Sequence, residues 1–416
     1  MKLAVIGGGS TYTPELADGI GRLLPGVTDF VLVDPDPARL AAVGPVSARI
    51  MAAHDHPAEV SWTDSLDEGT EGADAILFQL RIGGQAARQC DETWPLDCGC
   101  VGQETTGAGG LAKALRTVPI VLDLAERACR RASPSAFVID FTNPVGIVTR
   151  ALLSAGHRAV GLCNVAIGFQ REFAALLGIA PERVSLGHVG LNHLTWERSV
   201  WLDGADVLPE LLAKHADEIA PHTGLSADLI RHLGMVPSYY LRYYYAHDAV
   251  VESLRGAVTR AEEVARLEAE LLELYADPAL DTKPPQLAQR GGAWYSEAAV
   301  DLLVSLTGDR RDTQVVNTFN HGTLPFLPDD AVIEVPAVIG SGGADPVPVD
   351  PVDPLLRGLI AHVYAYEELA LDAAIRGGRD RVYNALLAHP LVGQADQAEC
   401  LTGRLIAENA NFLPWT

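Results

Sequence analysis

The sequence predicts an α/β fold, in which a Rossmann-type doubly wound parallel sheet is followed by an α+β domain. Short apolar runs alternate with segments of helical periodicity up to about residue 165, as in a parallel sheet covered by helices. The first run, at residues 3–6, passes through a glycine turn into a helix-like segment. Beyond residue 165 the alternation stops, so we expect domains at 1–165 and 166–416.

The strands of the first domain are expected to be buried on both faces, because their sequences are almost continuously apolar. The pattern predicts parallel strands at residues 3–6, 30–33, 75–80, 136–141 and 159–162. Between them, residues 38–53 and 111–131 have helical periodicity.

The second domain combines antiparallel strands with helices. Residues 184–201 and 315–338 have strand patterns, and residues 237–275 predict one long helix rich in Glu and Arg. Further helices are expected at 354–375, 379–388 and 397–410, whereas the glycines at 340–343 indicate a loop.

The glycine turn after the first strand predicts a dinucleotide site. Gly7 and Gly9 allow backbone N–H groups and a helix N-terminus to face a pyrophosphate. Tyr12 stands where the usual dehydrogenase pattern has a third glycine, and Ser10 and Thr11 add hydroxyl groups. We therefore expect a second ligand to contact this loop.

Asp34 indicates which dinucleotide binds. It ends the second predicted strand, about 25 residues after Gly9. An acid at this place accepts hydrogen bonds from an adenosine ribose and disfavours the extra phosphate of NADP. The alternative is a glycine turn with a capping acid, but the combination of strand, turn, helix and acid favours NAD.

The composition excludes several classes of partner and location. The formal net charge of −23 argues against nucleic acid and anionic membranes. No apolar stretch reaches a membrane-spanning length, and the chain starts with a strand pattern instead of a charged leader. The six cysteines have neither a disulfide framework nor a zinc spacing, so we expect a cytoplasmic protein with most cysteines free.

Polar loops follow the predicted strands, at the sheet edge where ligands of such folds gather. Arg81 and Arg88 lie in a glycine loop and suit an anionic group, because guanidinium binds phosphate in a bidentate way. Solvated surface arginines are the alternative. Glu104 belongs to another glycine-rich loop, and Asn143 follows a strand in what could equally be an ordinary turn.

Cys163 and His193 are candidates for a shared metal, each beside an asparagine. Thiolate and imidazole supply only half of a coordination shell, so substrate oxygens and a water would have to complete it. A buried cysteine and a capping histidine are the alternative interpretation.

Five tyrosines lie between residues 239 and 245. They either fill the core as an aromatic face or provide a phenol that acts as a base. A base needs a pKa far below about 10, so a metal or an arginine must stabilise the phenolate. Arg260 and Arg290 are candidates to supply positive charge.

With these motifs in place, the chain resembles glycoside hydrolase family 4, and within it the 6-phospho-β-glucosidases. The resemblance runs nearly end to end, and the order and spacing of its short segments make it specific. The segments are residues 7–16, 81–88, 102–110, 141–144, 161–164, 190–194, 240–244, 290–295 and 316–318.

The resemblance implies hydrolysis of 6-phospho-β-glucosides with NAD and a divalent metal, usually manganese. NAD⁺ takes hydride from carbon 3 of the sugar, a tyrosine removes the proton of carbon 2, and the metal stabilises the enediolate. The aglycone is then eliminated, water adds and hydride returns. It also implies a phosphorylated disaccharide or aryl glucoside as substrate, and a homodimer or homotetramer.

Residue by residue, the resemblance makes Cys163 and His193 metal ligands and Tyr240 the base. Arg88 and Asn143 resemble residues that bind the 6-phosphate and neighbouring hydroxyls. The resemblance also places substrate or cofactor phosphate beside Ser10, and Glu104 near the metal without a defined role. Asn164, Arg260 and Arg290 are further expected contacts of the substrate. Lysine is scarce around the expected phosphate site, so recognition is expected to depend on Arg88 and backbone amides.

Two alternatives have different requirements. An NAD-dependent 2-hydroxy-acid dehydrogenase of the lactate/malate type shares the overall architecture and could use His193, but Cys163 and Tyr240 would have no task. It would accumulate NADH from a hydroxy acid. A non-enzymatic NAD-binding protein would need neither a metal nor a base.

Overall fold

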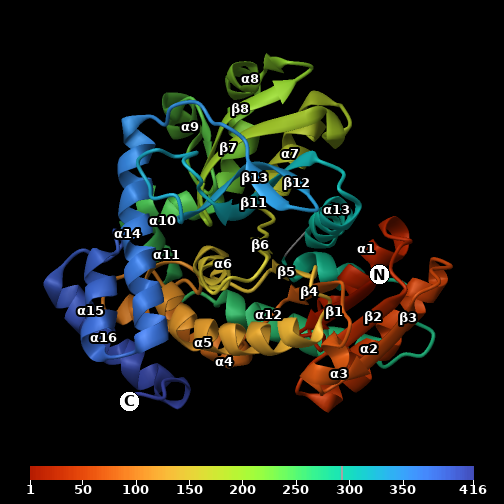
Figure 1. The fold of residues 1–416 in the computed structure, drawn as a ribbon. Helices are drawn as coiled ribbons and strands as arrows, with labels where there is room; N and C mark the ends of the chain where they lie inside the picture. The colour runs from red at the N-terminus through yellow and green to blue at the C-terminus, as the bar shows by residue number, and fades with distance from the viewer. Residues whose placement is uncertain (292–293) are drawn as a thin grey trace.

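The computed structural model describes residues 1–291 and 294–416. In this part of the chain the strands form one mixed sheet of thirteen strands, in the order β10-β8-β7-β12-β11-β6-β5-β4-β1-β2-β3, with β13 and β9 attached at its side. Figure 1 labels these strands except β9 and β10.

The first half of the sheet is parallel and has the strand order 3-2-1-4-5-6 of a doubly wound dinucleotide-binding fold. Its strands are β1 (Lys2–Ile6), β2 (Asp29–Val33), β3 (Glu59–Thr63), β4 (Ala75–Phe78), β5 (Phe137–Asp140) and β6 (Ala159–Gly161). All five predicted parallel strands are confirmed. The sequence pattern missed β3, because this edge strand is mostly exposed and lacks an apolar run.

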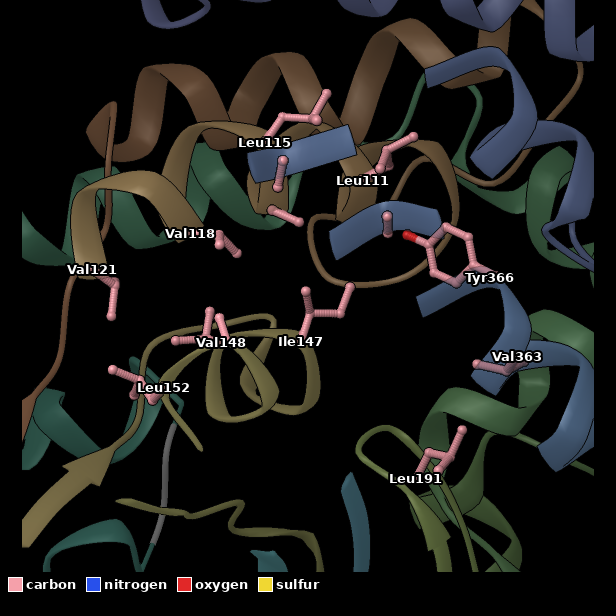
Figure 2. Packing of buried hydrophobic residues seen from close by; sticks show 14 of the residues in the cluster. Leu111, Leu115, Val118, Val121, Ile147, Val148, Leu152, Leu191, Val363 and Tyr366 are labelled. Carbon is pink, nitrogen blue, oxygen red and sulfur yellow. The ribbon is translucent and has the colours of Figure 1, made fainter. Parts of the chain in front are cut away.

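Helices connect and cover these strands. They are α1 (Thr13–Leu23), α2 (Pro37–Ala53), α3 (Leu66–Thr70), α4 (Gly84–Asp97), α5 (Gly107–Arg131), α6 (Val145–Ser154) and α7 (Val165–Leu177). Alternate residues of β1 belong to the two cores on opposite faces of the sheet, with Ile6 in one and Val5 in the other. Figure 2 shows the first core, where Val118 of α5 faces Val148 of α6.

The second half of the sheet is antiparallel. It contains β7 (Val184–Leu191), β8 (Leu194–Leu202), β9 (Ala205–Asp206), β10 (Val236–Pro237), β11 (Asp312–Phe319), β12 (Val332–Gly340) and β13 (Gly343–Pro346). The sheet is continuous, because Asn317 of β11 pairs with Gly161 of β6. A division of the chain at residue 165 stays a prediction. The expected loop at 340–343 is the tight turn of the β12–β13 hairpin.

The prediction of one long helix over residues 237–275 was wrong. The segment forms β10, a 3₁₀ turn (Tyr239–Leu241), α10 (Arg242–Tyr245), α11 (His247–Leu254) and α12 (Arg260–Tyr275). Gly256 adopts a left-handed φ of +71°, and Thr259 then starts α12 with a capping box to Glu262. These local signals override the helical periodicity.

The other helices of the second half are α8 (Leu208–Thr223), α9 (Ala227–Leu233), α13 (Tyr295–Gly308), α14 (Pro354–Arg376), α15 (Arg379–Ala388) and α16 (Ala395–Asn409). The three predicted C-terminal helices are confirmed. They pack beside α5, so the end of the chain completes a core that the first half begins (Figure 1). Among the described helices, none combines the length and the apolarity needed to cross a membrane.

One covalent link joins α16 to the first half. A disulfide connects Cys98, just after α4, to Cys400 of α16. Four cysteines are free, in agreement with the expectation that most would be. The pairing itself was not predicted, because 302 residues separate the two cysteines and only the tertiary fold brings them together.

Candidate active site

The carboxyl ends of the parallel strands open into a pocket of about 290 Å³. Nine expected site residues line it, from loops distant in the chain, and they are Ser10, Arg88, Glu104, Asn143, Asn164, His193, Tyr240, Arg260 and Arg290. Tyr12 and Arg81, which the sequence analysis also named, line it as well. The pocket therefore unites the expected substrate residues with the expected base and one expected metal ligand.

The glycine loop borders this pocket at the point where the strand order reverses. Gly7 has a φ of +88°, and a Cβ there would lie 2.8 Å from the carbonyl oxygen of Gln79, which follows β4. Only glycine allows this close approach between the loops after β1 and β4. Such a switch point is where dinucleotides bind in doubly wound sheets.

Asp34 shapes the same loop. Its Oδ2 accepts a hydrogen bond from the N–H of Gly9 at 3.0 Å, and Arg39 Nε donates to the carbonyl oxygen of Gly9 at 2.8 Å. A Cβ on Gly9 would contact the Asp34 carboxyl group at 2.8 Å. The loop therefore has no side chain at Gly9, and hydrogen bonds with Asp34 and Arg39 fix its backbone. This arrangement fits a dinucleotide.

The hydroxyl groups of the loop differ in position. Ser10 lines the pocket, and its Oγ accepts a hydrogen bond from the N–H of Tyr12 at 3.2 Å. Thr11 is buried, and its carbonyl oxygen accepts a hydrogen bond from Tyr275 at 2.6 Å. Ser10, and not Thr11, therefore presents a side chain to the pocket.

Glu104 lies at the centre of a cluster of cations. It forms an ion pair with Arg81, accepts a hydrogen bond from Lys113 Nζ at 2.6 Å, and lies 3.2 Å from Arg88 Nε. Burial opposes its ionisation, but Arg81 and Lys113 outweigh burial and hold its pKa well below the usual range. Arg88 also pairs with Glu92 at 2.7 Å.

Lys113 is a pocket residue that the sequence analysis did not single out. It is buried on α5, lines the pocket, and burial lowers its pKa to about 7. A lysine in the apolar start of α5 was the signal that could have found it. With Arg81 and Arg88, it gives an acidic protein a local positive site.

His193 and Tyr240 stack face to face, with ring centroids 3.6 Å apart and an interplanar angle of 10°. His193 is the second residue of the two-residue turn between β7 and β8, with a left-handed φ of +62°. Such a backbone costs roughly 1 kcal/mol or more for a non-glycine residue. The turn fixes the position of the imidazole.

The protonation of the stacked pair is set mainly by burial. Burial lowers the pKa of His193 to about 4, so its imidazole is neutral, and burial raises the pKa of Tyr240 well above its usual value. His193 Nδ1 hydrogen-bonds with Thr105 Oγ1 at 2.9 Å. Nε2 has no hydrogen-bond partner within the described chain and is the nitrogen that can bind a ligand.

Cys163 is buried directly after β6 and lies close enough to Tyr240 to raise its pKa. Burial, followed by the charge of Glu334, raises the pKa of the Cys163 thiol, whereas the backbone N–H groups of residues 164 and 165 and the Asn192 side chain favour its thiolate.

No group of three or more His, Cys, Asp or Glu residues in the described ranges could hold a metal ion. The two expected ligands, the Cys163 sulfur and the His193 imidazole, would supply half of a coordination shell, and substrate oxygens would have to supply the rest.

Two buried polar atoms at the pocket have no partner in the described part of the chain, Asn143 Oδ1 and Arg290 Nε. Arg290 Nη2 donates to Glu268 Oε1 at 2.7 Å, and Arg260 donates to the carbonyl oxygen of Gln289 at 2.6 Å. The unpartnered atoms are positions where a polar ligand would gain hydrogen bonds. Gly292 and Ala293, which belong to the 290–295 motif, lie outside the described residues.

Sequence reasoning missed an aromatic wall of the pocket. Tyr295 contacts Phe141 edge to face, with centroids 4.8 Å apart, and Tyr12 at 6.3 Å. All three rings line the pocket. No spacing rule identifies them, because they come from the loops after β1 and β5 and from the start of α13.

Comparison with known proteins agrees with this geometry. The model described as "Family 4 glycosyl hydrolase" matches residues 2–179, and its "C-terminal domain" matches residues 188–392. A "Probable 6-phospho-beta-glucosidase" of Bacillus subtilis is 36% identical over 434 aligned residues, covering 100% of this chain and 97% of the relative.

Solved structures give the same result. The 6-phospho-β-glucosidase of Thermotoga maritima, solved with manganese, NAD⁺ and glucose-6-phosphate, has a TM-score of 0.92 and 32% identity over 99% of each chain. Malate dehydrogenase from Aeropyrum pernix, at 15% identity and a TM-score of 0.55, shares the fold alone and confirms the expected architecture. The chain belongs to family 4 of the glycosyl hydrolases.

Proposed function

We propose that this protein hydrolyses 6-phospho-β-glucosides with NAD and a divalent metal, and that this metal is manganese. The observation that supports it best is the pocket, in which a stacked His193–Tyr240 pair faces the cation cluster around Glu104. Relatives that are named 6-phospho-β-glucosidases and a structure solved with these ligands support the same assignment.

The dinucleotide would bind across the loops that follow β1 and β2. Gly7 and Gly9 leave room for the pyrophosphate, and Asp34 lies at the end of β2, where it can accept hydrogen bonds from a ribose. Ser10 would reach a phosphate of the cofactor or of the sugar, and Thr11 would contribute its backbone.

Cys163 and His193 would hold the metal, with the imidazole binding through Nε2. When bound, NAD⁺ supplies reversible acceptance of hydride at carbon 3, and the metal supplies Lewis acidity at the oxygens of carbons 2 and 3. The remaining chemistry depends on the chain's own residues.

Tyr240 would take the proton from carbon 2 through its phenol oxygen. Burial alone keeps this phenol protonated, so it needs a neighbouring positive charge to act as a base at neutral pH. Its stacking on His193 supports this role, because a metal held by His193 would lie close to the phenol. The aromatic rings of Tyr12, Phe141 and Tyr295 line the same pocket and would exclude water from the bound sugar.

The sugar phosphate would bind among Arg88, Lys113 and Arg81, whose cationic groups surround Glu104. Asn143 would bind neighbouring hydroxyl groups through its unpartnered Oδ1. Asn164, Arg260 and Arg290 would complete the substrate side of the pocket, and Glu104 would orient the cations.

The remaining partners follow from the same proposal. The substrate would be a phosphorylated disaccharide or an aryl glucoside, and the protein would act in the cytoplasm as a homodimer or homotetramer. A hydroxy-acid dehydrogenase or a non-enzymatic NAD-binding protein would leave Cys163 and Tyr240 without a task.

The proposal is tested with an aryl 6-phospho-β-glucoside. Release of the aryl group should require NAD⁺, Mn²⁺ and a thiol reductant, and no net NADH should accumulate. Steady NADH formation from a 2-hydroxy acid, without glycoside cleavage, would favour the dehydrogenase instead. Loss of Mn²⁺ binding in Cys163→Ser would test the metal ligands separately from turnover.

A further inference from the structure

A polar network lies inside the sheet behind Cys163 and His193, and the mechanism above does not use it. Glu334 of β12 is 1% exposed and occupies a row that crosses four neighbouring strands. In this row it pairs with Asn317 of β11 and with Gly190 of β7, and Asn317 pairs in turn with Gly161 of β6. The row therefore spans the strands that lead to Cys163 and to His193.

Both oxygens of Glu334 are bound. Oε2 accepts hydrogen bonds from the side-chain amides of Asn192, at 2.8 Å, and Asn317, at 3.0 Å. Oε1 lies 3.1 Å from His188 Nε2, and His188 Nδ1 lies 2.6 Å from Glu197 Oε1. Burial opposes a charged imidazole, but the two carboxylates outweigh it and raise the pKa of His188 to about 10.

A network of this kind is not needed to hold the sheet together. Burying charges carries a large desolvation cost, and apolar residues of similar volume often stabilise a core equally well. Unlike apolar packing, the network supplies a hydrogen bond that fixes the direction of the Asn192 side chain.

Asn192 is the link from the network to the metal ligands. Its side chain donates to Glu334 and also faces the sulfur of Cys163. It precedes His193 in the two-residue turn, where the left-handed backbone of His193 needs support. One residue thus contacts one expected ligand through its side chain and is the chain neighbour of the other.

We propose that Glu334, acting through Asn192, is a positioning residue that orients Cys163 and His193 for metal binding. Hydrogen-bond partners behind metal ligands typically change metal affinity by about 10–100-fold when removed. This inference rests on the proposed ligation by Cys163 and His193, and it adds the residues that hold these two ligands in place.

The test is the affinity for Mn²⁺ of the full-length protein saturated with NAD⁺, measured by electron paramagnetic resonance of free Mn²⁺. Glu334→Gln keeps the shape of the side chain but removes the charge that accepts both amides. We expect its dissociation constant for Mn²⁺ to rise about tenfold or more, with NAD⁺ affinity unchanged. Asn192→Ala removes only the side chain that connects Glu334 to Cys163, and it should raise the dissociation constant for Mn²⁺ to a similar extent.

Asp91→Asn is the matched control. Asp91 is also fully buried and paired with a cation, and the hydrogen bonds that its side chain makes in the described chain go to Arg116, outside the Glu334–Asn192 network. This variant should lower the melting temperature without changing Mn²⁺ affinity. The double variant Glu334→Gln/Asn192→Ala should have the same dissociation constant for Mn²⁺ as the single variant that binds Mn²⁺ more weakly. The two effects should not add, because Glu334 acts through Asn192.

The outcomes separate this inference from the function on which it rests. If Cys163→Ser loses Mn²⁺ binding while folded Asn192→Ala and Glu334→Gln keep wild-type affinity, the positioning role is overturned and the ligand assignment stands. If Cys163→Ser keeps its Mn²⁺ affinity, the ligand assignment itself fails. Should Glu334→Gln not fold, Asn192→Ala decides the result alone.

Discussion

His193 and Tyr240 are stacked in parallel with their ring centroids 3.6 Å apart. The contact joins the turn between β7 and β8 to the 3₁₀ turn at Tyr239–Leu241, which are separate in the chain. A cation held by His193 would act on the Tyr240 phenol across this contact and lower its pKa, because positive charge favours the phenolate. In the proposed mechanism, this contact would couple metal binding to proton removal.

Tyr240→Phe should remove the base and keep the stack. We expect kcat to fall by about 10²–10⁴-fold, as for the loss of other general bases, with the affinities for Mn²⁺ and NAD⁺ unchanged. Tyr239→Phe is the control, because this neighbouring tyrosine is 40% exposed and does not line the pocket. Near-normal turnover in Tyr240→Phe would assign proton removal to another group.

Arg88→Lys should weaken recognition of the phosphate. Lysine keeps the charge but loses the fork that binds two oxygens at once. We expect KM for an aryl 6-phospho-β-glucoside to rise about tenfold, a loss of roughly 1.4 kcal/mol, with NAD⁺ affinity unchanged. Arg127→Lys, in an exposed ion pair, should behave as wild type. Equal KM values for wild type and Arg88→Lys would place the phosphate elsewhere.

The parallel half of the fold could be predicted because buried strands are continuously apolar and the glycine turn has a known geometry. The failures have local causes. β3 is an exposed edge strand without an apolar run, and the expected helix over 237–275 is broken at Gly256 and restarted at Thr259. Helical periodicity continued through both positions, so the pattern alone gave the wrong result.

The site was predictable residue by residue only where a motif identified it. Nine of the expected residues share one pocket, whereas Lys113 and Tyr295 were missed. Lys113 lies within a helix, and its role depends on its distance from Glu104, which no spacing encodes. Glu334 was missed for the same reason, because its partners come from strands far apart in the chain.

Asp140 should make stability depend on pH. Burial raises its pKa from 3.8 to about 8, so the folded protein keeps a proton that the unfolded chain releases. The contribution of this group to stability is therefore present below about pH 4 and is lost as the pH rises to 8, by about 1.4 kcal/mol per pH unit.

Asp140→Asn removes this titration and keeps an acceptor for the N–H of Thr142. Denaturant unfolding should show similar stabilities at pH 4.5 and a more stable variant at pH 8. A difference between the two proteins that stays constant over this range would contradict the assignment.

Thiol reductants should have two separable effects. Reducing the Cys98–Cys400 disulfide should lower the free energy of unfolding by about 2–5 kcal/mol, because the bond restricts the unfolded chain. Cys400→Ser should show the lower stability already, and reductant should not lower it further. Activity of this variant should still require reductant, because Cys163 must stay a free thiol to bind metal. If Cys400→Ser were active without reductant, the need for reductant would come from the disulfide and not from Cys163.

Exchange with solvent at carbon 2 tests the central claim most directly. The product of an aryl 6-phospho-β-glucoside is formed in D₂O with NAD⁺ and Mn²⁺, and deuterium at carbon 2 is measured by mass spectrometry and NMR. If Tyr240 removes that proton and elimination follows, the product carries deuterium at carbon 2. Product formed at the normal rate without deuterium at carbon 2 would contradict the mechanism.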